Sequence, residues 1–153
     1  MRRAYENWVA DYRSYAQKRG FRTFNDWPYH RRGFIEAWAQ PGFHHFWQVW
    51  NPGIGYFTYR CYLVMGGRRH RFLTTMAAFV ACGLVHSLIV FPFLGWSYSI
   101  VVAFTCFGLL ANASRGLAPL LRQERWPAAA NVLINVLFVL ASFDLGFSVN
   151  RVL

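Results

Sequence analysis

The segment FLTTMAAFVACGLVHSLIVFPFLGWSYSIVVAFTCFGLLANAS, from Phe72 to Ser114, decides the fold of this chain because it contains no Asp, Glu, Lys or Arg. One membrane-spanning helix needs about 20 predominantly apolar residues. The segment is therefore long enough for two crossings, separated by the uncharged link from Pro92 to Ser97. We place these two spans at about 72–93 and 98–114.

A third apolar segment begins at Pro127, reaches Asp144 and can extend to Val149, which places the third span at about 128–148. Of the 153 residues, 56% are hydrophobic, 20% aromatic and only 14% charged. A soluble chain of this length could not hide so much apolar surface in one core. The sequence therefore predicts an all-α integral membrane protein. It has about three transmembrane helices, with interfacial or re-entrant amphipathic helices on the N-terminal side.

The positive charge of the chain is concentrated before the first span. The net charge is +10, and residues 1–71 hold 12 of the 16 Lys and Arg residues but 4 of the 6 acidic residues. These cations alternate with aromatic residues, which is typical of a segment beside an anionic lipid surface and argues against nucleic acid as a partner. More arginines separate the second and third spans: Arg115, Arg122 and Arg125. The positive-inside rule then predicts a cytoplasmic N-terminus and a C-terminus outside. The membrane itself we expect to be the cytoplasmic (inner) membrane of a bacterium.

Residues 1–71 form a basic, aromatic-rich interfacial region that precedes the transmembrane region, 72–153. Four of its rings recur at the spacing of one helix face: Tyr5, Trp8, Tyr12 and Tyr15. This pattern predicts a helix that lies in the membrane interface or packs against the rest of the region. Ile54–Met65 is apolar except for Arg60, and its 12 residues are too few to cross a membrane. We predict a re-entrant or interfacial helix there.

His86 lies near the middle of the first predicted span. An ionisable group at that depth is costly when charged, so its presence indicates a functional site. A neutral imidazole can instead make a structural hydrogen bond between helices, and both interpretations stay open on this residue alone.

The third predicted span carries polar side chains near one face: Asn131, Asn135 and Ser142. Polar groups of this kind hold helices together in lipid, so we expect this face to contact another helix, in this chain or in a partner. The three cysteines are far apart and show no metal-ligand spacing. The sequence predicts no metal site and no bound cofactor.

A motif stands shortly before the span that contains His86. The segment FHHFWQVWNPGIGYFTYRCYLVMGG, from Phe43 to Gly67, contains an F-W-x-x-W-N-P run and ends in Gly-Gly, and a G-L-x-H run ending at His86 follows. Together these resemble the C-terminal catalytic part of the membrane-bound O-acyltransferase (MBOAT) family, in truncated form. The resemblance covers roughly Phe43 to Leu110, and Gln48 stands where relatives often carry a basic residue.

The resemblance implies that Asn51 and His86 face one reaction chamber. His86 would remove a proton from an acceptor hydroxyl, whose oxygen would attack the carbonyl of an acyl thioester such as acyl-CoA. Asn51 would orient the acceptor or stabilise charge on the carbonyl oxygen. The phosphates of an acyl-CoA substrate would arrive near three cationic or polar residues: Arg68, Arg69 and His70. These residues can equally serve as anchors of the membrane topology.

Two functions follow from these observations. The first is a non-catalytic accessory subunit of a larger membrane complex, because the chain is small and lacks the many spans of the MBOAT family. Its partners would be other integral membrane subunits and membrane lipids. The second is an O-acyltransferase, or half of one, whose chamber a partner completes. Between them the sequence favours the accessory subunit.

Overall fold

The computed structural model describes residues 11–18, 27–50, 52–67, 69–95 and 97–152, and every regular element within these ranges is a helix. Three helices are long and apolar enough to span a membrane: α5 (Arg71–Leu94), α6 (Tyr98–Leu121) and α7 (Ala128–Val152). A short helix, η1 (Gln123–Arg125), lies in the connection between α6 and α7. The predicted all-α fold with three transmembrane helices is therefore confirmed.

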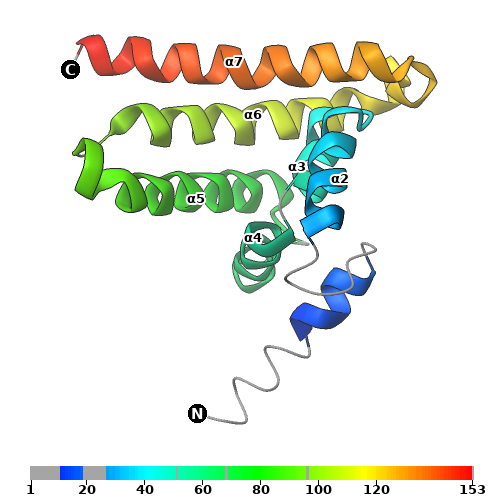
Figure 1. Ribbon diagram of the computed structural model, residues 1–153, viewed down its shortest axis with the longest axis horizontal. Coiled ribbons are helices and arrows are strands. Elements are labelled where there is room, and N and C mark those ends of the chain that lie inside the picture. Colours follow the sequence, from blue (N-terminus) through cyan, green and yellow to red (C-terminus); the bar gives the residue numbers. More distant parts are fainter. Residues whose placement is uncertain (1–10, 19–26, 51, 68, 96, 153) are drawn as a thin grey trace.

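The three spans lie side by side, and each runs opposite to the one before it (Figure 1). Their apolar stretches cover residues 71–93, 98–121 and 128–149. The second stretch is longer than the predicted 98–114, because α6 continues through Arg115 to Arg122, whose φ of 46° ends the helix. A long cationic side chain near the end of a span can keep its charge in polar surroundings, so Arg115 does not stop the helix.

Three shorter helices gather at the end of the bundle where α5 begins and α6 ends (Figure 1): α2 (Trp27–Trp38), α3 (Phe43–Trp50) and α4 (Pro52–Val64). Figure 1 shows α4 nearly end-on beside the spans, so its axis crosses theirs. At 1.5 Å per residue its 13 residues extend roughly 20 Å, which is less than the thickness of a bilayer core. The helix predicted over Ile54–Met65 thus forms, and it begins two residues earlier.

The aromatic N-terminal segment packs against α4. Residues 11–17 are helical, and Asp11 accepts a hydrogen bond from the Arg60 guanidinium at 2.9 Å. The ring of Tyr15 meets that of Tyr56 edge-on, with centroids 5.1 Å apart. Of the predicted aromatic face, Tyr12 and Tyr15 therefore lie against another helix of the same region, while Tyr5 and Trp8 fall outside the described residues.

A cluster of aromatic rings joins α3 to the spans. Phe43 and Phe46 of α3 are buried and their rings stack 5.5 Å apart. Phe43 also meets Phe107 of α6 and Phe138 of α7, at centroid distances of 5.9 and 5.5 Å. Such pairs stabilise a fold by about 0.5–1.5 kcal/mol each beyond the burial of their area. The short helices and the spans thus share one core.

Glycines allow the spans to approach closely. A Cβ placed on Gly83 of α5 would lie 2.9 Å from the Phe104 Cβ of α6, and one on Gly146 of α7 would lie 2.4 Å from the Ser99 carbonyl oxygen of α6. Small residues at these crossings are what lipid-embedded helices use to bring their backbones together. The contact at Gly146 is the tighter of the two, and its neighbour is backbone, which cannot turn away.

The polar face of α7 points into the protein. Asn131, Asn135 and Ser142 are all buried, and Asn135 is 1% exposed. The Asn135 amide donates to the carbonyl oxygens of Trp38 and Gln40, at 2.9 and 3.1 Å, and so ties α7 to the end of α2. Asn131 donates to the Gln123 carbonyl at 3.4 Å, and Ser142 donates to Phe138 in its own helix. Asn135 is the member of this face that joins two distant segments of the chain.

We expect Asn135→Val to lower the free energy of unfolding by about 1 kcal/mol, because it leaves the carbonyl oxygens of Trp38 and Gln40 without their shared donor. The matched control is Asn112→Ala, since among the described residues the Asn112 amide donates to the Gly108 carbonyl in its own helix and to no other helix. Thermal unfolding in detergent, followed by circular dichroism, compares the two variants. Equal losses of stability would mean that the bridge from α7 to α2 contributes nothing specific.

Candidate functional site

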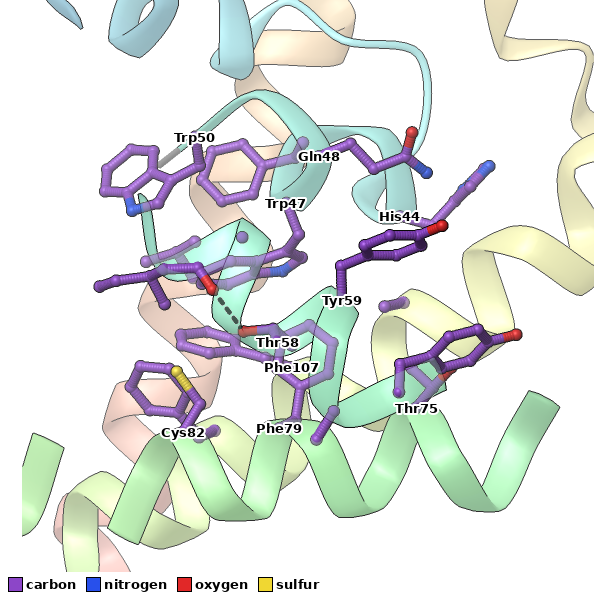
Figure 2. Close-up of a pocket in the computed structure, with 18 of the residues that line it drawn as sticks. His44, Trp47, Gln48, Trp50, Thr58, Tyr59, Thr75, Phe79, Cys82 and Phe107 are labelled. Carbon is purple, nitrogen blue, oxygen red and sulfur yellow. Dashed lines mark hydrogen bonds between the residues drawn. The ribbon is translucent and has the colours of Figure 1, made fainter. Parts of the chain in front are cut away.

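A cavity of about 560 Å³ lies between α3 and α4 on one side and α5 and α6 on the other. Its volume is in the range of small-molecule sites, and its lining is mostly apolar and aromatic, as such sites usually are. Trp47, Phe79 and Phe107 form much of this wall (Figure 2). Val139 and Phe143 of α7 complete it.

The cavity is elongated along the spans. Its lining runs from Thr75 to His86 on α5 and from Arg115 to Phe104 on α6. Each pair is eleven positions apart on a helix, which corresponds to about 16 Å. Because α5 and α6 are antiparallel, Thr75 and Arg115 share the end near the short helices. His86 and Phe104, whose ring centroids are 4.7 Å apart, share the end deeper in the bundle.

The two ends differ in polarity. Figure 2 shows His44, Gln48, Tyr59 and Thr75 gathered at one end, with Cys82 at the other. Between the ends the wall is aromatic and apolar, apart from Thr58, whose hydroxyl donates to the Ile54 carbonyl at 2.8 Å. A bound ligand would therefore contact polar groups at one end and apolar rings along the rest of its length.

His86 lines the deep end, with one ring nitrogen fixed. Its Nδ1 lies 2.8 Å from the Cys82 carbonyl oxygen. That oxygen can only accept a hydrogen bond, so this pairing assigns the proton of the neutral imidazole to Nδ1 and leaves the lone pair on Nε2. Within the part of the chain that the structure describes, Nε2 has no hydrogen-bond partner. His86 is thus arranged as a proton acceptor inside an apolar cavity.

The other residues predicted to take part in catalysis or in binding the acyl carrier lie outside the described residues or away from the cavity. Asn51 and Arg68 lie outside the described residues. Trp50, next to Asn51 in the sequence, lines the cavity. Arg69 and His70 are exposed in the turn before α5, and neither lines the cavity. The structure therefore does not bring Arg69 and His70 to His86.

A cation that the sequence indicated only as a topology signal does line the cavity. Arg115 lies at the end near the short helices, together with His44 of α3. Arg115 reaches the cavity because α6 continues beyond Ser114. The charge pattern of the sequence did not predict this continuation. Of the aromatic wall, the motif in the sequence contains Phe46, Trp47 and Trp50, whereas Phe79, Phe104 and Phe107 belong to no motif.

His44 and Ser114 connect α3 to α6 at this end. The His44 Nδ1 and the Ser114 Oγ are 3.1 Å apart. Burial lowers the pKa of His44 from 6.5 to about 4, and the nearby His45 and Arg115 add to this effect. His44 is therefore neutral near pH 7. Gly42, with φ of +89°, lies against the same pair, and a Cβ there would be 2.9 Å from the Ser114 Oγ.

The lowered pKa of His44 predicts a loss of stability in mild acid. The unfolded chain binds a proton near pH 6.5 and the folded chain only near pH 4, so the stability is complete above pH 6.5 and falls as the pH decreases through that window. We expect the melting temperature of the wild type to fall more steeply between pH 6.5 and 4 than that of His44→Asn, which keeps a polar group but cannot titrate. Parallel curves of melting temperature against pH for the two proteins would show that protonation of His44 is not linked to unfolding.

Within the described ranges, no group of three or more His, Cys, Asp or Glu side chains is placed to hold a metal ion. Comparison of the chain with protein-family models, with curated proteins and with solved structures finds no match.

Proposed function

We propose that the protein transfers an acyl group from a thioester carrier to a hydroxyl, with His86 as the general base. The observation that carries this proposal is the Nε2 of His86, which faces an apolar cavity and has no hydrogen-bond partner among the described residues, while Nδ1 is anchored on the Cys82 carbonyl. The resemblance of the F-W-x-x-W-N-P and G-L-x-H motifs to the MBOAT family supports the same chemistry.

In the proposed reaction, the acceptor hydroxyl gives its proton to Nε2 as its oxygen bonds to the thioester carbonyl carbon. The bond from carbon to sulfur then breaks, and the leaving thiolate takes the proton back from the imidazolium. The ester and the free thiol are the products, and His86 returns to its neutral form. The aromatic wall keeps water from the carbonyl, which disfavours hydrolysis.

The charge pattern supports an orientation with the short helices toward the cytoplasm of a bacterial inner membrane. Exposed arginines stand at this end of the bundle: Arg69, Arg71, Arg122 and Arg125. Under the positive-inside rule the polar end of the cavity then lies toward the compartment that holds soluble acyl thioesters such as acyl-CoA. Asn51 stays a candidate for orienting the acceptor.

The direct test uses purified protein in lipid vesicles, with palmitoyl-CoA as donor and a monoacylglycerol as acceptor. A thiol reagent measures release of free CoA, and mass spectrometry measures the ester. We expect release above that of protein-free vesicles, dependent on the acceptor. Release equal to that of empty vesicles, for this donor and for a shorter acyl-CoA, would contradict the proposal.

A second candidate is a non-catalytic accessory subunit of a larger membrane complex. It is favoured by the surface of α7, whose apolar stretch is only 17% buried within the chain and which exposes a row of leucines, Leu133, Leu137 and Leu140. Such a row can contact lipid or another span. Native purification in mild detergent, followed by mass spectrometry, tests this role. Stoichiometric co-migration with other membrane proteins, together with no thiol release, would favour it over catalysis.

A further inference from the structure

Among the described residues that line the cavity, Arg115 is the one with a permanent charge, and none is Asp or Glu. Among the described residues, the ion pairs join Arg32 to Glu36 and Arg60 to Asp11, and Arg115 has no carboxylate within 4 Å. Arg115 is partly buried. A guanidinium held near an apolar wall gains more from an anion than one in bulk water, because the surroundings screen the charge less.

The length and lining of the cavity restrict the rest of the ligand. From Arg115 the lining continues for about 16 Å to Phe104 and His86, a distance along α6 that corresponds to eleven residues. The walls between these ends are formed mainly by aromatic rings, with Trp47, Phe79 and Phe107 prominent in Figure 2. A ligand that fits must be narrow, apolar over most of its length and anionic at one end.

Uncharged polar groups surround the cationic end. His44, Gln48, Tyr59 and Thr75 gather at one end of the cavity in Figure 2, and none of them carries a negative charge. They can donate to or accept from an oxygen-rich headgroup beside Arg115. Along the cavity the lining is therefore charged, then polar, then apolar. An anionic amphiphile has the same order of groups along its length.

We propose that the cavity binds a lipid with one acyl chain and an anionic group, such as a free fatty acid or a lysophospholipid. The anionic group pairs with Arg115 and the chain extends along Trp47, Phe79 and Phe107 toward His86. A bound chain covers the Nε2 of His86, so such a lipid inhibits any reaction that uses this atom. The binding itself does not depend on acyl transfer.

The test is equilibrium binding of labelled palmitate, hexadecanol and palmitoyl lysophosphatidic acid to the full chain in lipid nanodiscs, with empty nanodiscs subtracted. The wild type should bind both anionic lipids about tenfold to a hundredfold more tightly than hexadecanol, the range expected for a charge-assisted hydrogen bond. Arg115→Gln should remove this preference and leave hexadecanol binding unchanged. The tighter of the two anionic lipids identifies the headgroup as carboxylate or phosphate.

The matched control is Arg122→Gln, which removes an exposed arginine that does not line the cavity. It should keep the preference, and Arg115→Lys should keep part of it. Equal binding of palmitate and hexadecanol by the wild type, or an equal loss in Arg122→Gln, would overturn the proposal. The readout is binding and not thiol release. The preference for anionic lipids can therefore be absent while acyl transfer is observed, and acyl transfer can be absent while these lipids bind.

Discussion

His86→Gln should lower the rate of acyl transfer by about two to four orders of magnitude, the range that a positioned general base contributes. Glutamine has a similar reach and can still donate to the Cys82 carbonyl, but its amide cannot take a proton near neutral pH. The variant therefore removes the proton acceptor and retains a polar side chain at the same position. The measurement is the initial rate of acceptor-dependent thiol release in vesicles, at saturating donor.

The control for this prediction is His45→Gln, which changes a histidine that does not line the cavity. We expect its rate to stay within a few-fold of the wild type. Both variants need the wild-type melting temperature and elution volume, so that a loss of rate is not a loss of fold. An unchanged rate in His86→Gln would remove His86 from the mechanism, and equal losses in both variants would indicate general damage to the site.

Gly146→Ala should destabilise the protein by about 1–3 kcal/mol, as overpacking of a well-packed contact does. The added methyl group would lie 2.4 Å from the Ser99 carbonyl oxygen, so α7 and α6 must move apart. Gly146→Leu should prevent native packing, because no side-chain rotation can relieve a clash with backbone. Thermal unfolding in detergent and size-exclusion chromatography measure the two effects.

Gly116→Ala is the matched control, since Gly116 lies in α6 and, apart from its chain neighbours and its own helix backbone, no described atom lies within 4 Å of an added Cβ. In a helix this change should stabilise the protein slightly, by up to about 1 kcal/mol. The two Gly→Ala variants should therefore shift the melting temperature in opposite directions. A shift of the same sign and size in both would mean that the approach of α7 to Ser99 does not limit the packing.

The three spans could be predicted from the sequence because the thickness of a membrane requires about 20 predominantly apolar residues in a helix that crosses it. The first and third predicted spans agree with the structure to within about one residue. The second predicted span ended too early, because its boundary was placed before Arg115. A cation near the end of a span does not break a helix. Backbone geometry ended α6 instead, at Arg122.

The candidate site was predictable only in part. The depth of His86 in the span together with the preceding motif made it a candidate, and the structure places it in a cavity wall. The cavity itself depends on how α4 crosses the spans and on how α3 packs against α6, and neither arrangement has a local sequence signal. For the same reason Arg115 was interpreted as a topology signal, and its position at the cavity became evident only from the fold.

The hydrogen bonds from Asn135 to α2 also have a consequence for synthesis of the chain. Trp38 and Asn135 are 97 positions apart, so at typical rates of translation the α2 end of this bridge emerges roughly 5–20 s before its donor. During that interval Phe43 also lacks its contact with Phe138. A chaperone or the insertion machinery that shields α2 and α3 in this period would thus protect the wall of the cavity until the last helix has entered the membrane.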